Sequence, residues 1–212
     1  MKKFLLTLLI GFGISSCNHS VIELQPISEA NYSVNSIASL ELNEALLNSP
    51  FRLMAATTSG KEEIPYQRNE NIIYWKTSSD VSSYNLEKEK PMDYSAVQLV
   101  ESDEQLEVYQ NGTKIIGYQT ALKGVPEGVS EAYQRNGYLH PVNTPKGKRL
   151  TRIQPEDHYH HYGIWNPWTH TLFEGDTLDF WNLNKKQGTI RFAKLLKKNT
   201  GPVFSEIEVL QE

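Results

Sequence analysis

Four of the chain's six histidines fall within one short segment, Pro155 to His170, which reads PEDHYHHYGIWNPWTH. The same segment holds an acidic pair, Glu156 and Asp157, and two tryptophans. Histidine is the side chain whose ordinary pKa lets it give or take a proton near neutral pH. Three roles stay open for this segment: a metal site, acid/base contact with a substrate, or a buried hydrogen-bond network.

The spacing of the histidines suits a strand. Side chains on a strand alternate between two faces, so His158 and His160 would share one face and His161 would take the other. Two imidazoles on one face could bind a divalent metal ion, with Asp157 as a further ligand or as the group that holds a histidine tautomer. His140 is a further member that the fold could bring in. The predicted catalytic residues are therefore His158, His160, Asp157 and His140, and the candidate metal ligands are His158 and His160.

Aromatic side chains accompany the histidines. Tryptophan rings beside such a group could stack on sugar rings, although packing in a buried core is also open to them. The predicted substrate-binding residues are Trp165, Trp168, His161 and His170. If the segment instead forms a buried hydrogen-bond network, Trp165, Trp168 and Trp181 would serve only as packing.

The N-terminal residues, MKKFLLTLLIGFGISSC, are typical of a secretory signal, because two lysines precede an apolar run that is too short to span a bilayer comfortably. The sequence ISSC resembles a bacterial lipobox, and Cys17 is the chain's single cysteine. We expect residues 1–17 to be a lipoprotein signal, with lipidation at Cys17. The protein would then lie in the cell envelope, anchored to the membrane by its lipid, with a periplasmic or a surface-facing position left open.

The charge of the chain argues against nucleic acid as a partner. The formal net charge is -4, and removal of Lys2 and Lys3 with the signal would make it -6. No basic stripe offsets this acidity. If Cys17 is acylated, no thiol remains for a disulfide or a nucleophile, so a metal site would depend on histidines and carboxylates.

The rest of the sequence predicts an all-β fold. Asn111-Gly112 between two short apolar runs is a strong hairpin signal, and further hairpins are expected within 171–183 and 188–212. Strands at this spacing, with Gly, Pro and Asn turns, indicate an antiparallel β-sandwich. Charge and proline interrupt the strands near residues 86–95, which predicts a small N-terminal β module over 18–95 and a sandwich domain over 96–212.

Several blocks together resemble the PmoA-like family, secreted bacterial proteins often labelled "methane oxygenase PmoA". The blocks are GYLHP, PKGKRLT, DHYHHYGIW and DFWN, and they contain Gly137, Tyr138, His140, Pro141, Pro145, Gly147, Leu150, Thr151, Asp157, His158, His160, His161, Gly163, Trp165, Asp179, Phe180, Trp181 and Asn182. Tyr162 stands where many relatives carry arginine, so a role that this arginine has in the relatives is not assigned to Tyr162. The resemblance spans most of residues 45–212.

The resemblance implies a sandwich like that of aldose mutarotases and polysaccharide-processing enzymes, a mutarotase-like supersandwich. Relatives usually continue with further strands, so we expect this chain to be a C-terminally truncated member. The oxygenase label fits poorly, because nothing after the signal is apolar enough to cross a bilayer. A copper site built on an N-terminal histidine is also incompatible with an acylated Cys17.

The favoured hypothesis is an envelope lipoprotein that acts on or binds a carbohydrate through a histidine-rich cleft. One alternative is a copper- or iron-dependent oxidoreductase, as the family label implies. Another is a non-catalytic glycan-binding lipoprotein. A divalent metal is the one cofactor that the residues allow us to consider, and substrate, reaction and enzymatic character stay open.

Overall fold

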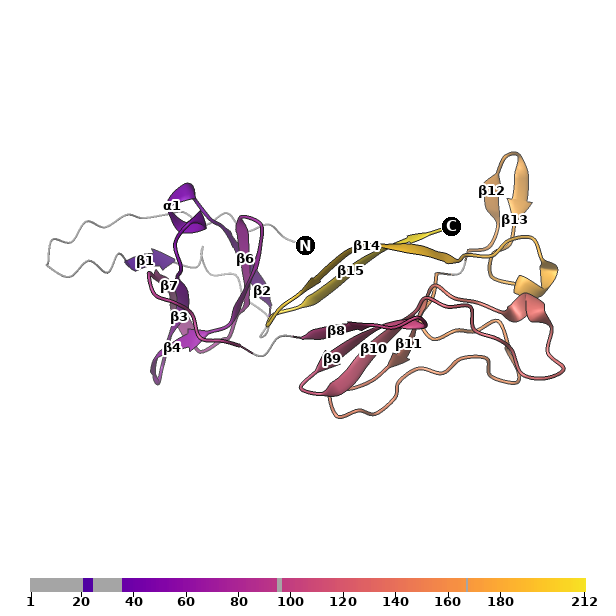
Figure 1. Ribbon diagram of the computed structural model, residues 1–212, viewed down its shortest axis with the longest axis horizontal. Coiled ribbons are helices and arrows are strands. Elements are labelled where there is room, and N and C mark those ends of the chain that lie inside the picture. The colour runs from indigo at the N-terminus through magenta and orange to yellow at the C-terminus, as the bar shows by residue number, and fades with distance from the viewer. Residues whose placement is uncertain (1–20, 25–35, 95–96, 167) are drawn as a thin grey trace, which may run out of the picture. The chain divides into compact units, whose positions relative to one another are not determined.

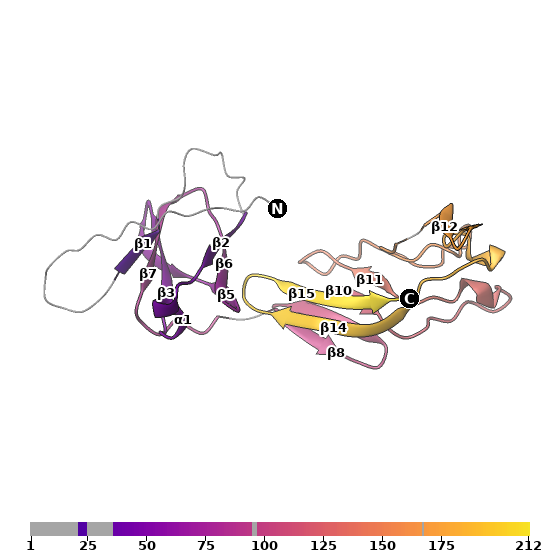
Figure 2. The same ribbon diagram turned by 90° about the horizontal axis from the view of Figure 1, so that it is seen from above.

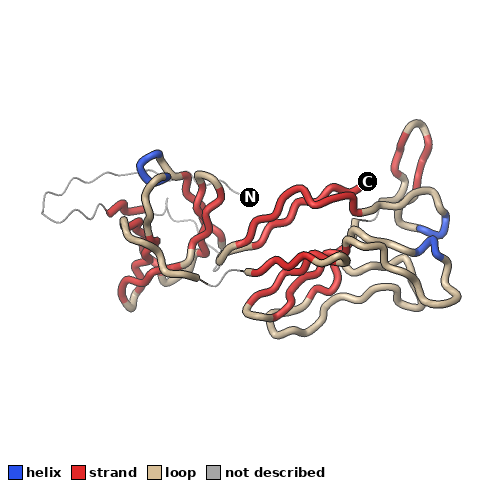
Figure 3. The backbone as a smooth tube through the Cα atoms, in the orientation of Figure 1, coloured by secondary structure: helices blue, strands red, loops and turns tan. Residues whose placement is uncertain are grey.

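The computed structural model describes residues 21–24, 36–94, 97–166 and 168–212. Antiparallel strands make up nearly all regular structure in these ranges, and helix is confined to one short α-helix and two 3-10 turns (Figure 3). The prediction of an all-β fold with antiparallel sheets is confirmed. The predicted signal and Cys17 lie outside the described residues. Within the described ranges, no helix has the length and apolar character needed to span a membrane.

The chain divides into two compact units. One contains residues 1–95 together with 202–204, and the other contains residues 96–201 and 205–212. The predicted modules, 18–95 and 96–212, differ from this division in the short segment 202–204. That each module folds as an independent domain stays a prediction.

The first unit is built from two antiparallel sheets, with strand orders β1-β7-β3-β4 and β2-β6-β5 (Figure 1). The elements are β1 (Val21–Leu24), β2 (Ile37–Glu41), α1 (Glu44–Leu47), β3 (Arg52–Thr57), β4 (Gly60–Ile64), β5 (Tyr66–Asn69), β6 (Ile72–Lys76) and β7 (Val81–Glu87). Asn43 caps α1, because its Oδ1 accepts a hydrogen bond from the Leu46 backbone N–H at 3.1 Å.

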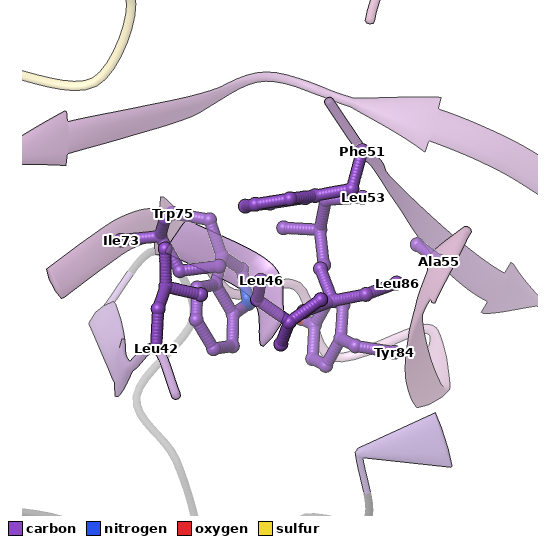
Figure 4. Close-up of a cluster of buried hydrophobic side chains, with 9 residues drawn as sticks. All are labelled: Leu42, Leu46, Phe51, Leu53, Ala55, Ile73, Trp75, Tyr84 and Leu86. Atoms are coloured by element: carbon purple, nitrogen blue, oxygen red, sulfur yellow. The ribbon is translucent and has the colours of Figure 1, made fainter. Parts of the chain in front are cut away.

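Apolar side chains from both sheets and from α1 form the core of the first unit (Figure 4). The cluster consists of Leu42, Leu46, Phe51, Leu53, Ala55, Ile73, Trp75, Tyr84 and Leu86. The segment 202–204 belongs to this unit, and the side-chain oxygen of Gln67 accepts hydrogen bonds from the backbone N–H groups of Val203 and Phe204, at 3.3 and 3.0 Å. Burial of apolar side chains, as in this cluster, is the main source of folding stability.

The second unit contains a four-stranded antiparallel sheet, with strand order β11-β10-β9-β8, and two hairpins. The elements are β8 (Gln98–Glu101), β9 (Gln105–Gln110), β10 (Thr113–Gln119), η1 (Glu131–Tyr133), β11 (Tyr138–Val142), β12 (Thr171–Phe173), β13 (Asp176–Leu178), η2 (Leu183–Lys185), β14 (Phe192–Thr200) and β15 (Ser205–Gln211).

The long hairpin of β14 and β15 lies along the four-stranded sheet (Figure 2). The rings of Phe192 on β14 and Tyr118 on β10 meet edge to face, with centroids 5.9 Å apart. Gln211 on β15 donates hydrogen bonds to the Tyr118 hydroxyl at 3.0 Å and to the Gly137 carbonyl at 2.9 Å. These contacts make the hairpin a second layer over the sheet.

The three hairpins expected in the second unit are present. β9 and β10 pair around Asn111 and Gly112, whose φ angles are 49° and 75°. Both values lie in the left-handed region that a two-residue hairpin turn requires, which explains why Asn-Gly occupies it. The β12–β13 and β14–β15 hairpins are the other two.

Candidate functional site

The histidine segment runs beside β11 as an irregular chain. Backbone hydrogen bonds link Leu139 and Ile164 in both directions, at 2.8 and 3.0 Å. Gly163 has a φ of 48°, and a Cβ at this position would lie 2.2 Å from the Leu139 carbonyl oxygen. Only glycine allows this approach, so Gly163 sets how closely the segment lies against the sheet.

The expectation that His158, His160 and His161 lie on a strand is wrong. Two consecutive turns occupy their place: the backbone N–H of His158 donates to the Pro155 carbonyl at 2.8 Å, and that of His161 donates to the His158 carbonyl at 3.0 Å. Proline and aspartate at the first of these turns favour a bend over a strand. The alternation of faces assumed from the sequence therefore does not apply.

The turns bring the three imidazole rings together. The rings of His158 and His161 stack, with centroids 4.8 Å apart and planes inclined by 15°. His160 meets His161 edge to face at 4.4 Å and His158 at 5.6 Å. His161, expected on the opposite face, is thus a central member of what we call the histidine cluster, made of His158, His160 and His161.

The cluster is open to solvent in part. The side chain of His158 is 51% exposed, and Nδ1 of this ring lies 3.0 Å from Oδ2 of Asp157. His160 and His161 are half-buried. Among the described residues, the ring nitrogens of His160 and His161 form no hydrogen bond. These rings are therefore not members of a saturated buried network, and their nitrogens can meet a ligand or water.

The electrostatics of the cluster favour a neutral His160. Burial lowers the pKa of His160, and the neighbouring His161 and His158 lower it further, while Asp179 acts in the opposite direction. The pKa of Asp157 is lowered chiefly by its hydrogen bond with His158. At neutral pH, His160 can therefore accept a proton, and Asp157 is a carboxylate beside His158.

Two tryptophans extend the cluster. The ring of Trp181 lies 6.3 Å from that of His160 and 6.2 Å from that of His161, and Trp165 lies 5.6 Å from Trp181. Both are half-buried. Trp165 was predicted as a binding residue, whereas Trp181 was considered only as packing. The sequence feature that could have identified Trp181 is its place in the DFWN block, one of the blocks that carry the family resemblance.

Asp179 fixes the loop that carries Trp181. Its carboxylate accepts hydrogen bonds from the backbone N–H groups of Trp181 and Asn182, at 3.0 and 2.9 Å. It also accepts from the Asn182 amide at 2.7 Å and from Lys185 at 2.8 Å. These bonds, the Asn182 N–H first among them, hold the pKa of Asp179 far below its usual range. The backbone that carries the indole is thus held by a carboxylate that is ionised at neutral pH.

Arg135 lies beneath Trp165. It is only 2% exposed, and the carbon of its guanidinium lies 4.2 Å from the centroid of the Trp165 ring. No hydrogen bond or ion pair of its guanidinium is present among the described residues, and Nη1 is buried without a partner. Burial lowers the pKa of Arg135 to about 10, so it stays charged at neutral pH. No sequence pattern singled out Arg135, because an arginine's burial depends on distant parts of the chain.

His140 does not join the histidine cluster. Its Nδ1 lies 2.9 Å from the Thr151 hydroxyl. Burial lowers its pKa, and the charges that act on it come from Arg149, Lys114 and Lys123 rather than from the other histidines. In the described part of the chain, no contact links it to the three rings. The predicted orienting role of His140 therefore has no structural support.

Trp168 and His170 are also separate from the cluster. Trp168 is 52% exposed, and its Nε1 donates to the Asn166 side-chain oxygen at 2.6 Å. His170 is exposed and has a φ of 53°, directly before β12. Neither ring contacts the cluster in the described residues, so the structure brings together only part of the predicted binding set.

The donor atoms of the cluster do not form a ready metal site. In the described ranges, no group of three or more His, Cys, Asp and Glu side chains is arranged to hold a metal ion. The stacked pair shows one reason. Imidazole lone pairs lie in the plane of the ring, so the nearly parallel rings of His158 and His161 direct them side by side, not toward a common point.

Comparison with known proteins places this all-β chain in a family. Residues 105–212 match a family of unknown function, DUF6807, and the chain belongs to that family. The match covers the sheet strands β9 to β11, the histidine cluster and the hairpin of β14 and β15. No curated protein matches the chain, and no solved structure does.

Proposed function

We propose that this protein binds a carbohydrate at the surface formed by the histidine cluster with Trp165 and Trp181. The observation that carries the proposal is the gathering of three partly exposed imidazoles beside indole rings, with the nitrogens of His160 and His161 open to a ligand. Indole faces suit the C–H faces of sugar rings, and imidazole nitrogens suit their hydroxyls.

The same arrangement supports acid/base chemistry. His160, neutral because burial and its histidine neighbours lower its pKa, would accept a proton from a hydroxyl of the bound sugar. The carboxylate of Asp179, which acts to raise the pKa of His160, would offset the positive charge that this transfer creates. Carbohydrate binding is the primary proposal. Catalysis on the bound carbohydrate is a further proposal that would be measured separately.

Replacement of His160 with alanine tests the proposal. His170→Ala is the matched control, because His170 is an exposed histidine outside the cluster. Binding would be measured on a glycan array and then by calorimetry with the glycan retained. We expect His160→Ala to weaken binding at least about tenfold with an unchanged melting temperature, and His170→Ala to bind as the wild type does. Equal affinities of the two variants, or no glycan binding by the wild type, would refute the proposal.

The cellular setting is a separate proposal. The signal-like N-terminus and the resemblance to PmoA-like proteins support an envelope lipoprotein with a lipid on Cys17. Metabolic labelling with palmitate in a bacterial host should label the wild type and not Cys17→Ser. Labelling of both, or of neither, would contradict it.

The metal-dependent alternative needs a third donor near His158 and His160, which the described residues do not supply as arranged. Metal analysis of protein purified without chelators decides it. Stoichiometric copper or iron would favour an oxidoreductase over the sugar proposal.

A further inference from the structure

A cavity of about 280 Å³ lies in the second unit, between η1 and η2, and none of the cluster histidines lines it. Its lining comes from four separate stretches of chain: Leu122, Glu131, Ala132, Gln134, Leu183, Lys186, Gln187, Gly188, Thr189 and Arg191. Ligand pockets commonly measure about 300–1,000 Å³, so this one, just below that range, suits a ligand as small as a single sugar ring.

Local interactions fix the walls of this cavity. Ser130 caps η1 through a hydrogen bond from the Ala132 backbone N–H to its hydroxyl, at 3.3 Å. The Lys186 N–H donates to the Leu183 carbonyl at 3.0 Å and closes η2. A Cβ at Gly188 would lie 2.5 Å from the Phe180 ring, so only glycine keeps this wall in place. The cavity is thus formed before a ligand arrives.

The polar side chains that line the cavity are not engaged with one another. Gln134, Gln187 and Thr189 form no side-chain hydrogen bond within the described residues, and Glu131, Lys186 and Arg191 form no ion pair there. The neighbouring Lys185 differs, because it is paired with Asp179 at 2.8 Å. Two cations against one carboxylate leave the lining positive, although the whole chain carries a net charge of -4.

We propose that this cavity binds an anionic monosaccharide, with Lys186 and Arg191 holding its charged group. Gln134, Gln187, Thr189 and Glu131 would hold the sugar hydroxyls, and the exposed side chain of Leu122 would cover an apolar face of the ring. The charged group is a carboxylate or a phosphate, which have this recognition chemistry in common. The proposal goes beyond carbohydrate binding at the histidine cluster, because no histidine lines the cavity.

Calorimetric titration with four probes tests the proposal: glucuronate, glucose 6-phosphate, glucose and inorganic phosphate. We expect at least one anionic sugar to bind about tenfold or more tightly than both glucose and inorganic phosphate. Tight binding of glucuronate alone would assign a carboxylate, and of glucose 6-phosphate alone a phosphate. Arg191→Gln and Lys186→Gln should each weaken this binding about tenfold, whereas Lys194→Gln, an exposed lysine on β14, should not.

Other outcomes would overturn the assignment. Glucose binding as tightly as both anionic sugars would remove the role of the cations, and inorganic phosphate binding as tightly would remove the sugar. Binding of none of the four probes would also reject it. If Arg191→Gln lowers the melting temperature, Arg191→Lys should restore both fold and binding. His160→Ala should leave this binding unchanged, so failure here and failure at the histidine cluster are distinguishable.

Discussion

The interiors of the two units differ in chemistry. In the first unit, the core is a continuous group of aliphatic and aromatic side chains, with Leu53, Ala55 and Ile73 fully buried. In the second, buried tyrosines are accompanied by charged groups, Arg135 and Asp179. Apolar burial stabilises a fold directly, whereas a buried charge costs free energy unless it is paired.

The two buried charges of the second unit differ in how well they are paired. Asp179 has four hydrogen-bond donors, but Arg135 has only the face of Trp165 among the described residues. A buried charge without a partner costs folding free energy, so we infer that Arg135 is kept because it supports the Trp165 ring. We infer that the first unit is organised for stability and that part of the second is organised around its site.

The largest effect is expected from the core of the first unit. Leu53→Ala should lower the free energy of unfolding by about 2–5 kcal/mol, because it removes a fully buried side chain and leaves a cavity. Denaturant unfolding measures it. Leu172→Ala is the control, because Leu172 on β12 is 75% exposed, and it should change stability by no more than about 0.5 kcal/mol. Equal effects of the two variants would contradict the described core.

A smaller effect of opposite sign is expected at Arg135. Arg135→Met removes an unpaired buried cation whose desolvation costs several kcal/mol, while the contact with Trp165 returns only about 2 kcal/mol. The variant should unfold at the same or a higher denaturant concentration, and it should bind the glycan about tenfold more weakly, because Trp165 loses its support. A less stable variant with unchanged affinity would show that Arg135 serves the fold alone.

The smallest effect concerns pH. The folded-state pKa of His160 lies below its ordinary value of 6.5, so the unfolded chain binds this proton more readily. The contribution of His160 is therefore complete above pH 6.5 and is lost as the pH falls through the lowered folded-state value. Melting temperatures between pH 7.5 and about 5 should fall less in His160→Gln than in the wild type. A parallel fall in both proteins would count against a depressed pKa.

The sequence predicted those parts of the fold that depend on neighbouring residues. Asn111 and Gly112 favour a tight turn wherever they occur between strands, and the hairpin they form is present. The prediction of a strand for the histidine segment was wrong, because two turns occupy this position and place His161 in the cluster. The approach of Trp181, the burial of Arg135 and the separate place of His140 depend on contacts between distant segments, which periodicity does not encode.

The most direct test of the histidine cluster is a proton NMR titration of the histidine ring signals, with and without bound glycan. We predict that His160 titrates below pH 6.5 in the free protein and that glycan shifts the signals of His160 and His161, but not that of His170. Ordinary titration of His160, with no response of the cluster to any glycan that the protein binds, would contradict the account.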